Sequence, residues 1–241
     1  MNLVIDIGNS FSKVGVFDKN ILIKYKEFKI FSVHDIKTFF SYTKITNSII
    51  SNVSNPDKKV FDFLNMNSNL VLFDSQLKLP FKNKYYSLET IGNDRIALVS
   101  QASNLYPNKN VLIIDLGSCI TYDFLNEKNE YLGGGISPGL NMKLKALNDQ
   151  TAKLPLVKKT KIEYLIGKST ECSILSGVVN GTRGEINFII EEYKKRYKKI
   201  VIILTGGDSK FLFNHIKNGI LAEPKFLLSG LNFLIDLNKK E

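Results

Sequence analysis

The sequence predicts an α/β fold of two related domains, because one motif occurs twice in it. The segments Leu3-Val-Ile-Asp-Ile-Gly-Asn-Ser10 and Leu112-Ile-Ile-Asp-Leu-Gly-Ser-Cys119 each combine an apolar run with Asp, an apolar residue, Gly and a small polar residue. Asp115 stands 109 residues after Asp6, near half of the 241-residue chain, so a duplicated domain is favoured over a short repeat. We place the domains at residues 1–105 and 106–241.

Each motif begins a set of strands that can pair as a meander, and helices then alternate with strands, which is typical of a mixed sheet. The first half predicts strands at residues 2–7, 12–18, 21–29, 47–53 and 69–73, with helices at 33–43 and 57–66. The second half predicts strands at 111–116, 119–126, 129–133 and 200–205, with helices at 138–148, 169–198, 208–216 and 226–238. The polar stretch 74–91 predicts a loop near a site.

Composition excludes several classes of protein. With 44% hydrophobic residues the chain can bury a core, so a disordered chain is excluded. The longest apolar runs fall far short of the ~18 residues that indicate a spanning helix. The start of the chain predicts a core strand and leaves no room for a signal peptide. Cys119 and Cys172 form neither a disulfide framework nor a zinc cluster, and His34 and His215 are isolated, so we expect reduced thiols in the cytoplasm.

The basic balance, 33 Lys and Arg against 23 Asp and Glu, raises the question of nucleic-acid binding. Only Arg95, Arg183 and Arg196 are arginines, although base readout and bidentate phosphate contacts depend on Arg. The lysines are scattered, apart from a cluster at residues 194–199 that ends a predicted helix. We therefore expect a solvated basic surface, whose field suits an anionic substrate, and neither a nucleic-acid nor a membrane partner.

Asp6 is the first candidate functional residue, at the end of a predicted buried strand. Gly8 permits a tight turn after it, and Asn9, Ser10 and Ser12 offer hydrogen-bond donors. Such a turn can present N–H groups to a phosphate, and the carboxylate can hold Mg²⁺ through water. An ordinary hairpin with a polar tip is the alternative for this turn taken alone.

Two further turns strengthen the phosphate hypothesis. Asp115-Leu-Gly-Ser118 repeats the first turn, and two such turns can bind both ends of a polyphosphate and share cations. A pair of structural turns is the alternative. Thr205-Gly-Gly-Asp208 follows an apolar strand, where Gly206 and Gly207 allow close approach of a ligand such as adenosine. A plain strand-to-helix turn with Asp208 as N-cap is the alternative.

Gly92-Asn-Asp-Arg95 begins a helix that continues through Val99. An acidic residue near a helix N-terminus is stabilised by the dipole, and this is the structural alternative. As functional residues, Asp94 would be a general base for a substrate hydroxyl, and Arg95 would bind an anion such as a carboxylate.

Two other segments have structural readings. Gly133-Gly-Gly-Ile-Ser-Pro-Gly139 leaves a strand, and its backbone either faces a substrate or only turns a corner. Pro138 suits the first position of the next helix. Gly167-Lys-Ser-Thr170 resembles the end of a P-loop, but Ile162 stands where that loop needs Gly. We expect Thr170 to cap the long helix that follows or to reach a ligand from its start.

Taken together, these motifs resemble those of type III pantothenate kinases, from Asp6 to about Asp208. The Gly-x-Asp-Arg motif at 92–95 and the Gly-Gly-x-Ile-x-Pro-Gly stretch at 133–139 are the most specific. The resemblance implies the actin, hexokinase and heat-shock-chaperone ATPase superfamily. It therefore implies two ribonuclease-H-like domains with mixed five-stranded sheets and an active site in the cleft between them.

The resemblance also implies roles for individual residues. ATP phosphates and Mg²⁺ would bind the stretch from Asp6 to Lys13, and Ser118 would contact ATP. Pantothenate would bind Tyr85, Gly92, Asn93, Asp94, Arg95 and Thr170, with Asp94 as catalytic base. Asp115 would hold a monovalent cation, K⁺ or NH₄⁺. The implied reaction is in-line transfer from ATP to the primary hydroxyl of pantothenate, giving 4'-phosphopantothenate in the first step of coenzyme A biosynthesis, by a homodimer.

The chain departs from the family pattern at a few positions. Ser10 and Ser118 replace Thr, which keeps the hydroxyl, whereas Ile120 lacks a hydroxyl that the family favours. Asp6, Asp94 and Asp115 are all present. Two alternatives stay open: a kinase of the same superfamily with another small-molecule substrate, and a non-catalytic regulatory or accessory protein on the same scaffold.

Overall fold

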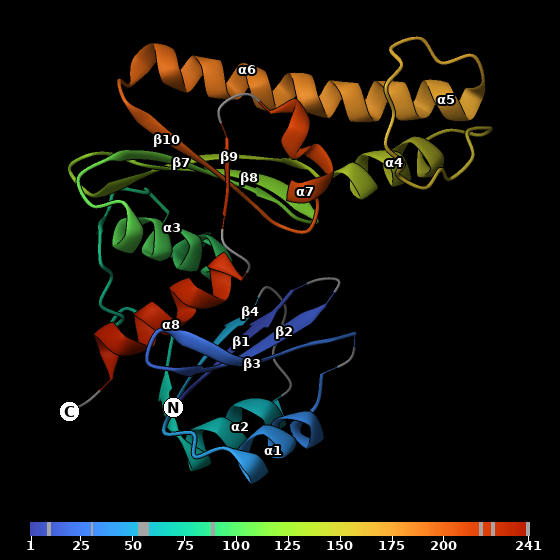
Figure 1. The fold of residues 1–241 in the computed structure, drawn as a ribbon. Helices are drawn as coiled ribbons and strands as arrows, with labels where there is room; N and C mark the ends of the chain where they lie inside the picture. The colour runs from blue at the N-terminus through green and yellow to red at the C-terminus, as the bar shows by residue number, and fades with distance from the viewer. Residues whose placement is uncertain are drawn as a thin grey trace. The chain divides into compact units, whose positions relative to one another are not determined.

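A computed structural model describes residues 1–8, 11–29, 31–52, 58–87, 90–216, 219–222 and 225–239 of the chain. The fold is mixed α/β with two mixed sheets, as predicted (Figure 1). Two compact units are present. The first comprises Met1–Pro107, Asn129–Tyr131 and Pro224–Glu241, and the second comprises Asn108–Lys128 and Leu132–Glu223. The sequence division at residues 105/106 stays a prediction.

The first unit is built on a five-stranded sheet of order β3-β2-β1-β4-β5. β1 pairs antiparallel with β2 and parallel with β4, while β3 and β5 extend the sheet at its two edges. The strands and helices of this sheet are β1 (Asn2–Ile7), β2 (Ser12–Asp18), β3 (Ile21–Phe28), α1 (Val33–Tyr42), β4 (Asn47–Asn52), α2 (Lys58–Asn67) and β5 (Asn69–Val71). These bounds agree with the predicted elements to within two residues.

Alternation along β1 gives the first sheet two apolar faces. Leu3 and Ile5 belong to a buried cluster that includes residues of α1 and α2. Val4, between them, belongs to another buried cluster that includes residues of α3 (Asn93–Leu105) and α8 (Phe226–Asn238). Figure 1 shows the two pairs of helices on opposite sides of this sheet. Because side chains alternate along a strand, Asp6 is on the same face as Val4.

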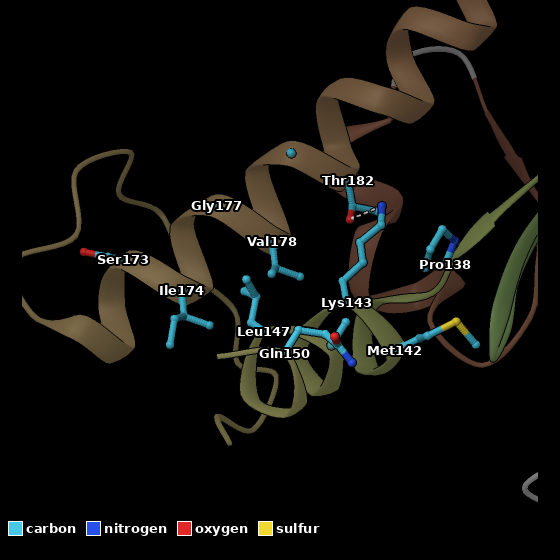
Figure 2. A pocket seen from close by; sticks show the side chains of 12 residues that line it. Pro138, Met142, Lys143, Leu147, Gln150, Ser173, Ile174, Gly177, Val178 and Thr182 are labelled. Carbon is cyan, nitrogen blue, oxygen red and sulfur yellow. Dashed lines mark hydrogen bonds between the residues drawn. The ribbon is translucent and has the colours of Figure 1, made fainter. Parts of the chain in front are cut away.

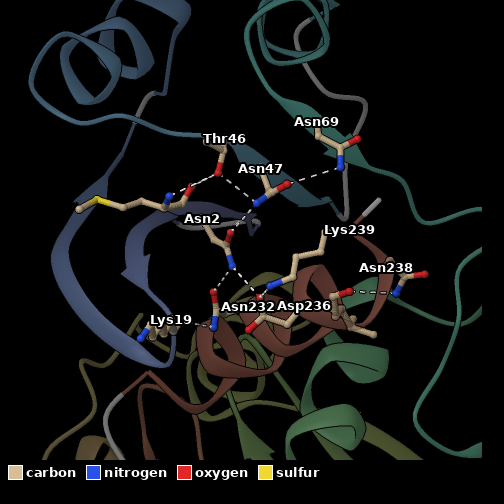
Figure 3. A network of polar contacts seen from close by, with 11 residues as sticks. Asn2, Lys19, Thr46, Asn47, Asn69, Asn232, Asp236, Asn238 and Lys239 are labelled. Carbon is tan, nitrogen blue, oxygen red and sulfur yellow. Dashed lines mark hydrogen bonds and ion pairs between the residues drawn. The ribbon is translucent and has the colours of Figure 1, made fainter. Parts of the chain in front are cut away.

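Helix α8 belongs to the first unit although it closes the chain. Its Asn232 and Asp236 accept hydrogen bonds from the Asn2 side chain at 2.9 and 3.2 Å (Figure 3). A Cβ atom on Gly230 would lie 2.0 Å from the Ala97 carbonyl oxygen, so only glycine permits this contact between α8 and α3. A polar network and a close helix contact therefore hold α8 to β1 and α3.

The second unit repeats the strand order of the first. β7 (Asn110–Leu116) pairs antiparallel with β8 (Cys119–Leu125) and parallel with β10 (Ile200–Thr205), which pairs in parallel with β11 (Ile220–Leu221). β9 (Glu130–Pro138) lies next to β8. In the first unit, β6 (Lys82–Asn83) pairs in parallel with Glu130 and Tyr131 and is a strand that the sequence analysis did not predict.

The helices of the second unit pack on one face of its sheet. They are α4 (Leu140–Asp149), α5 (Thr170–Leu175), the π-helical turn η2 (Ser176–Asn180), α6 (Gly181–Arg196), α7 (Ser209–Leu212) and the 3₁₀ turn η3 (Phe213–His215). The predicted helix 169–198 is thus continuous but contains one π-helical turn. The shared core includes Leu112, Ile114, Leu144, Val179 and Ile190.

One predicted helix start and one predicted N-cap are wrong. Pro138 is the last residue of β9, and Gly139 is the N-cap of α4. The strand runs on because Gly134 packs against the Tyr122 backbone, where a Cβ atom would lie 1.6 Å from the carbonyl oxygen. Thr170 is the first residue of α5 and does not cap it. The cap is Ser169, whose hydroxyl accepts a hydrogen bond from the Cys172 amide at 3.2 Å.

Candidate active site

Asp6 is held near the end of β1 by strands on both sides. It stands in register with Lys13 of β2 and with Ser51 of β4. Asp6 is 5% exposed and Ser51 is fully buried, so the carboxylate is almost removed from water. The Lys13 Nζ lies 4.0 Å from the carboxylate, at the limit of an ion pair.

Burial raises the pKa of Asp6 from 3.8 to about 6. Lys13 and the Ser51 hydroxyl act in the opposite direction, because both favour the charged carboxylate. The Asp94 carboxylate adds to the rise by like-charge repulsion. Asp6 and Asp94, far apart in sequence, therefore interact electrostatically within the first unit.

Two neighbouring carboxylates suit a hard cation. Mg²⁺ in kinases is bound by one or two carboxylates together with substrate phosphates rather than by a cage of protein ligands. The described residues contain no cluster of three or more His, Cys, Asp or Glu that could hold a metal alone. Asp6, with its raised pKa and Asp94 nearby, fits a cation that arrives with a polyphosphate.

Asp94 lies in the first turn of α3, where the helix dipole stabilises a negative charge. Its Oδ1 accepts a hydrogen bond from the Arg95 amide at 2.8 Å. A Cβ atom on Gly92, the N-cap, would lie 2.3 Å from the same oxygen. Glycine at position 92 therefore leaves the room in which the Asp94 carboxylate sits, and this explains the Gly-x-Asp spacing.

Tyr85 and Arg95 are brought together beside this helix start. The Arg95 guanidinium carbon lies 5.5 Å from the centre of the Tyr85 ring, and Arg95 is 5% exposed. The Tyr85 ring also stacks on Tyr131, with centroids 6.1 Å apart. The predicted loop 74–91 thus contributes a tyrosine to the group formed by Asp94 and Arg95. Asn93, the first residue of α3, is next to them.

The turn after Asp6 is only partly described. The Gly8 amide donates to the Phe11 carbonyl at 3.2 Å, which closes the turn between β1 and β2. Ser12 is buried at the start of β2. The predicted phosphate-binding residues Asn9 and Ser10 lie outside the described residues.

In the second unit, the turns at Asp115 and Gly206 touch each other. Asp115 stands in register with Thr205, and the next residue, Gly206, has a φ of +89°. A Cβ atom on Gly206 would lie 2.3 Å from the Asp115 Oδ1, and the Asp208 amide donates to the Leu116 carbonyl at 2.9 Å. The Asp115 carboxylate therefore lies directly against the turn that begins at Gly206.

Glycine also brings the tip of the Asp115 turn against the start of α4. The Gly139 amide donates to the Ser118 carbonyl at 3.1 Å. A Cβ atom on Gly139 would lie 2.4 Å from that oxygen. The predicted ATP contact Ser118 is thereby fixed beside a helix N-terminus, which is a favourable place for an anion.

Thr170 is placed at the start of α5 in the second unit. Residues 167–170 do not form a P-loop, because no strand leads directly into them and Gly167 packs against the backbone of the first turn of α5. A Cβ atom on Gly167 would lie 2.3 Å from the Ser173 amide nitrogen. Thr170 itself is exposed.

Sequence reasoning missed three polar residues next to the predicted ones. Ser51 was findable, because a parallel β1–β4 pair brings it alongside Asp6. Asp123 is fully buried and accepts a hydrogen bond from Thr121 at 3.1 Å, on the strand paired with Asp115. The sequence indicates Asp123 through the alternation of Thr and Asp, two polar residues two positions apart, within an otherwise apolar strand. Lys159, which pairs with Asp208, had no sequence signal.

One cavity of about 750 Å³ lies in the second unit between α4 and the α5–η2–α6 helix (Figure 2). Its walls are mainly apolar, with Met142, Leu147 and Ile174 among them. Lys143 reaches its edge and donates to Thr182 at 3.1 Å. Among the described residues that line it, none is a predicted site residue. None of the described helices is both long and apolar enough to cross a bilayer.

Comparison with known proteins bears on this site. A family model described as "Type III pantothenate kinase" matches residues 2–192. A type III pantothenate kinase from Christiangramia forsetii is 46% identical over 243 residues, covering 100% of each chain. One from Flavobacterium johnsoniae is 38% identical over 234 residues, covering 96% of each chain.

Solved structures match the fold at lower identity. A Streptomyces griseus glucokinase of the ROK family, in complex with glucose and AMPPNP, aligns with a TM-score of 0.55 at 11% identity. The alignment covers 98% of each chain. At this identity the match concerns the fold alone, which is the actin-like ATPase fold of the ROK and sugar kinases.

Proposed function

The chain belongs to the type III pantothenate kinase family, and from this premise we propose that Asp94 is the general base of its phosphoryl transfer. The family catalyses the first step of coenzyme A biosynthesis with ATP and Mg²⁺. The reaction proposed for this chain moves the γ-phosphoryl group of ATP to the primary hydroxyl of pantothenate. The observation that carries the role of Asp94 is its position at the start of α3, close enough to perturb the buried Asp6.

Asp94 would accept the proton of the pantothenate hydroxyl as that oxygen attacks the γ-phosphorus. Its carboxylate is oriented by the Arg95 amide and by the helix start, so little reorganisation is needed when the proton arrives. In-line transfer depends mainly on position and on charge stabilisation rather than on covalent chemistry. The packing of Gly92 against the carboxylate supports a fixed base.

Pantothenate would be oriented by Tyr85, Gly92, Asn93 and Arg95. The Arg95 guanidinium lies over the Tyr85 ring, so an anion at this position would meet a charge that is partly shielded from water. Arg recognises carboxylates in a bidentate geometry, and pantothenate carries one carboxylate. Thr170 would contribute a hydroxyl to the same substrate from the start of α5.

The phosphates of ATP would be bound by both Asp-Gly turns. In the first unit, Gly8, Asn9, Ser10, Ser12 and Lys13 would supply amides, hydroxyls and one ammonium group. In the second unit, Ser118, Gly206 and Gly207 would contact ATP, and the close packing of Gly206 on Asp115 supports a backbone approach. Asp6 would hold Mg²⁺ and Asp115 a monovalent cation, K⁺ or NH₄⁺. Bound there, these cations would neutralise phosphate charge.

We also propose that the protein is a homodimer in the cytoplasm. The support for the dimer is family membership. The support for the compartment is the presence of two free cysteines, as expected where thiols are kept reduced.

The reaction is tested by mass spectrometry of the products. Purified protein is incubated with ATP, Mg²⁺ and K⁺, and with pantothenate or, separately, with glucose, N-acetylmannosamine or no acceptor. A product of the mass of phosphopantothenate in the pantothenate sample alone is the expected result. A phosphorylated sugar, or ADP release that does not depend on pantothenate, would overturn the proposal. The exposed-residue variant Asp62→Asn, on α2, is the matched control for later Asp94 variants.

A further inference from the structure

An ion pair between Lys159 and Asp208 holds the Thr205–Asp208 turn, and neither residue has a role in the proposed reaction. Lys159 donates to the Asp208 carboxylate, which is 10% exposed, while the Lys159 side chain is 34% exposed. Asp208 is at the N-cap position of α7, yet its side chain makes no capping hydrogen bond. The carboxylate thus faces Lys159 rather than the helix.

We propose that Lys159 is a positioning residue for ATP binding, because it holds the Gly206–Gly207 turn against Asp115 through Asp208. The Asp208 amide is bonded to the Leu116 carbonyl at 2.9 Å, so the residue that carries the carboxylate also attaches the turn to the Asp115 strand. This inference rests on the proposed role of Gly206, Gly207 and Asp115 in binding ATP and a cation.

Lys159 is presented by an irregular segment, residues 151–169, that follows α4. The segment is fastened along its length by side chains from neighbouring helices. The Asn148 side chain donates to the Leu154 carbonyl at 2.7 Å, and Arg183 donates to the Ile162 carbonyl at 3.2 Å. Ile162 is 4% exposed in the core of the second unit. The ammonium group of Lys159 is therefore held between fixed points rather than on a free loop.

The geometry of the turn makes such a restraint useful. Gly206 has a φ of +89° and stands within contact of Asp115, so a small shift of the turn changes the surroundings of that carboxylate. Removing one partner of a partly buried ion pair is destabilising, because the remaining charge stays desolvated without a counter-charge. Without Lys159, the Asp208 carboxylate would move toward water and take the turn with it.

The same segment leads to the start of α5. The Asn180 side chain donates to the Tyr164 carbonyl at 3.1 Å, and the Ser176 hydroxyl donates to the Leu165 carbonyl. Thr170, the proposed pantothenate contact, begins the next helix. These hydrogen bonds are C-terminal to Lys159 and do not involve it. A Lys159 variant should therefore weaken ATP binding more than pantothenate binding.

The test measures ATP affinity without turnover. Calorimetry with a non-hydrolysable ATP analogue, Mg²⁺ and K⁺ compares wild type, Lys159→Met, Lys159→Arg and the controls Lys158→Met and Lys161→Met, whose lysines are exposed on the same segment. Lys159→Met is expected to raise the Kd for the analogue about tenfold, which corresponds to about 1.4 kcal/mol of binding free energy lost when the turn is no longer held in place. Lys159→Arg, which keeps the charge, and both controls should stay within about twofold of wild type.

Steady-state kinetics and thermal unfolding separate positioning from stability. The KM for ATP should rise in Lys159→Met while the KM for pantothenate stays within about twofold of wild type. Adding Asp208→Asn to Lys159→Met should cause no further loss and should recover part of the lost affinity, because it removes the charge that Lys159→Met leaves unpaired. A lower unfolding temperature with unchanged analogue affinity, or an equal loss in Lys158→Met, would overturn the inference.

A glycine variant distinguishes failure of this inference from failure of the proposed site. If Gly206→Ala folds and leaves analogue affinity unchanged, the turn does not bind ATP and both proposals fall. If Gly206→Ala weakens analogue binding and Lys159→Met does not, only the role of Lys159 is overturned.

Discussion

The buried carboxylate of Asp6 should make the native enzyme less stable than it could be. Replacing it by the isosteric amide, Asp6→Asn, removes a group that ionises in an almost dry position, with 5% exposure. We expect this variant to unfold at a higher temperature than wild type at neutral and alkaline pH, while it loses activity that depends on metal and ATP. Such an opposition between stability and activity is common at functional sites.

The magnitude follows from the pKa of Asp6, which burial raises from 3.8 to about 6. The Asp6 carboxyl binds its proton more tightly in the native state than in the unfolded chain. The stability that this tighter proton binding contributes is complete below pH 3.8 and is lost as the pH rises through about 6. This shift of about two pKa units corresponds to a loss of about 3 kcal/mol in the free energy of unfolding, which is reached in full above pH 7. For a chain of this length that equals an increase of about 6–12 °C in unfolding temperature for Asp6→Asn.

The assay is thermal unfolding of nucleotide-free protein between pH 4.5 and 8.5. The difference between Asp6→Asn and wild type should be smallest at pH 4.5, about a third of its full value, and should reach that value by pH 8. Asp18→Asn, an exposed carboxylate at the end of the neighbouring strand β2, is the matched control and should show no such trend. An Asp6→Asn variant that is less stable than wild type at pH 8, or a difference that does not change with pH, would refute the reasoning.

Three further variants test the second unit. Gly206→Ala should lower the free energy of unfolding by about 2 kcal/mol, because alanine at positive φ is strained and its Cβ meets Asp115; urea titration measures this, and an unchanged midpoint would contradict it. Asp115→Asn should abolish stimulation by K⁺, measured as the rate in K⁺ against the rate in tetramethylammonium; a retained ratio speaks against the cation role. Thr170→Ala should raise the KM for pantothenate about tenfold with little change for ATP, and equal effects on both would assign Thr170 another role.

The sequence predicted the fold well where periodicity and turns decide it. The repeated Asp-Gly motif led to two sheets of the same strand order, and the strand bounds around Asp6 and Asp115 were nearly correct. The start of α4 was predicted wrongly, because Pro138 is favoured at a first helical position but is also tolerated at a strand end. What extended the strand was Gly134 against the Tyr122 backbone, a contact that is distant in sequence.

The candidate site was predicted as residues but not as an arrangement. Asp94 was recognised by its motif, yet its interaction with Asp6 depends on how α3 packs on the face of β1 that carries Val4. No sequence pattern distinguishes Lys159, because it is one of several lysines in an irregular segment. Long-range pairs of this kind are set by the tertiary structure, so periodicity and spacing cannot indicate them.

The role of Asp94 is tested most directly by a single turnover. Enzyme in excess over radiolabelled ATP is mixed with pantothenate and quenched rapidly, for wild type, Asp94→Asn and the control Asp62→Asn. We expect Asp94→Asn to slow phosphopantothenate formation about 10²- to 10⁴-fold, as loss of a general base does, while ATP affinity and the unfolding temperature stay close to those of Asp62→Asn. A rate for Asp94→Asn close to that of the control would show that another group, or none, accepts the proton, and the account of this site would be wrong.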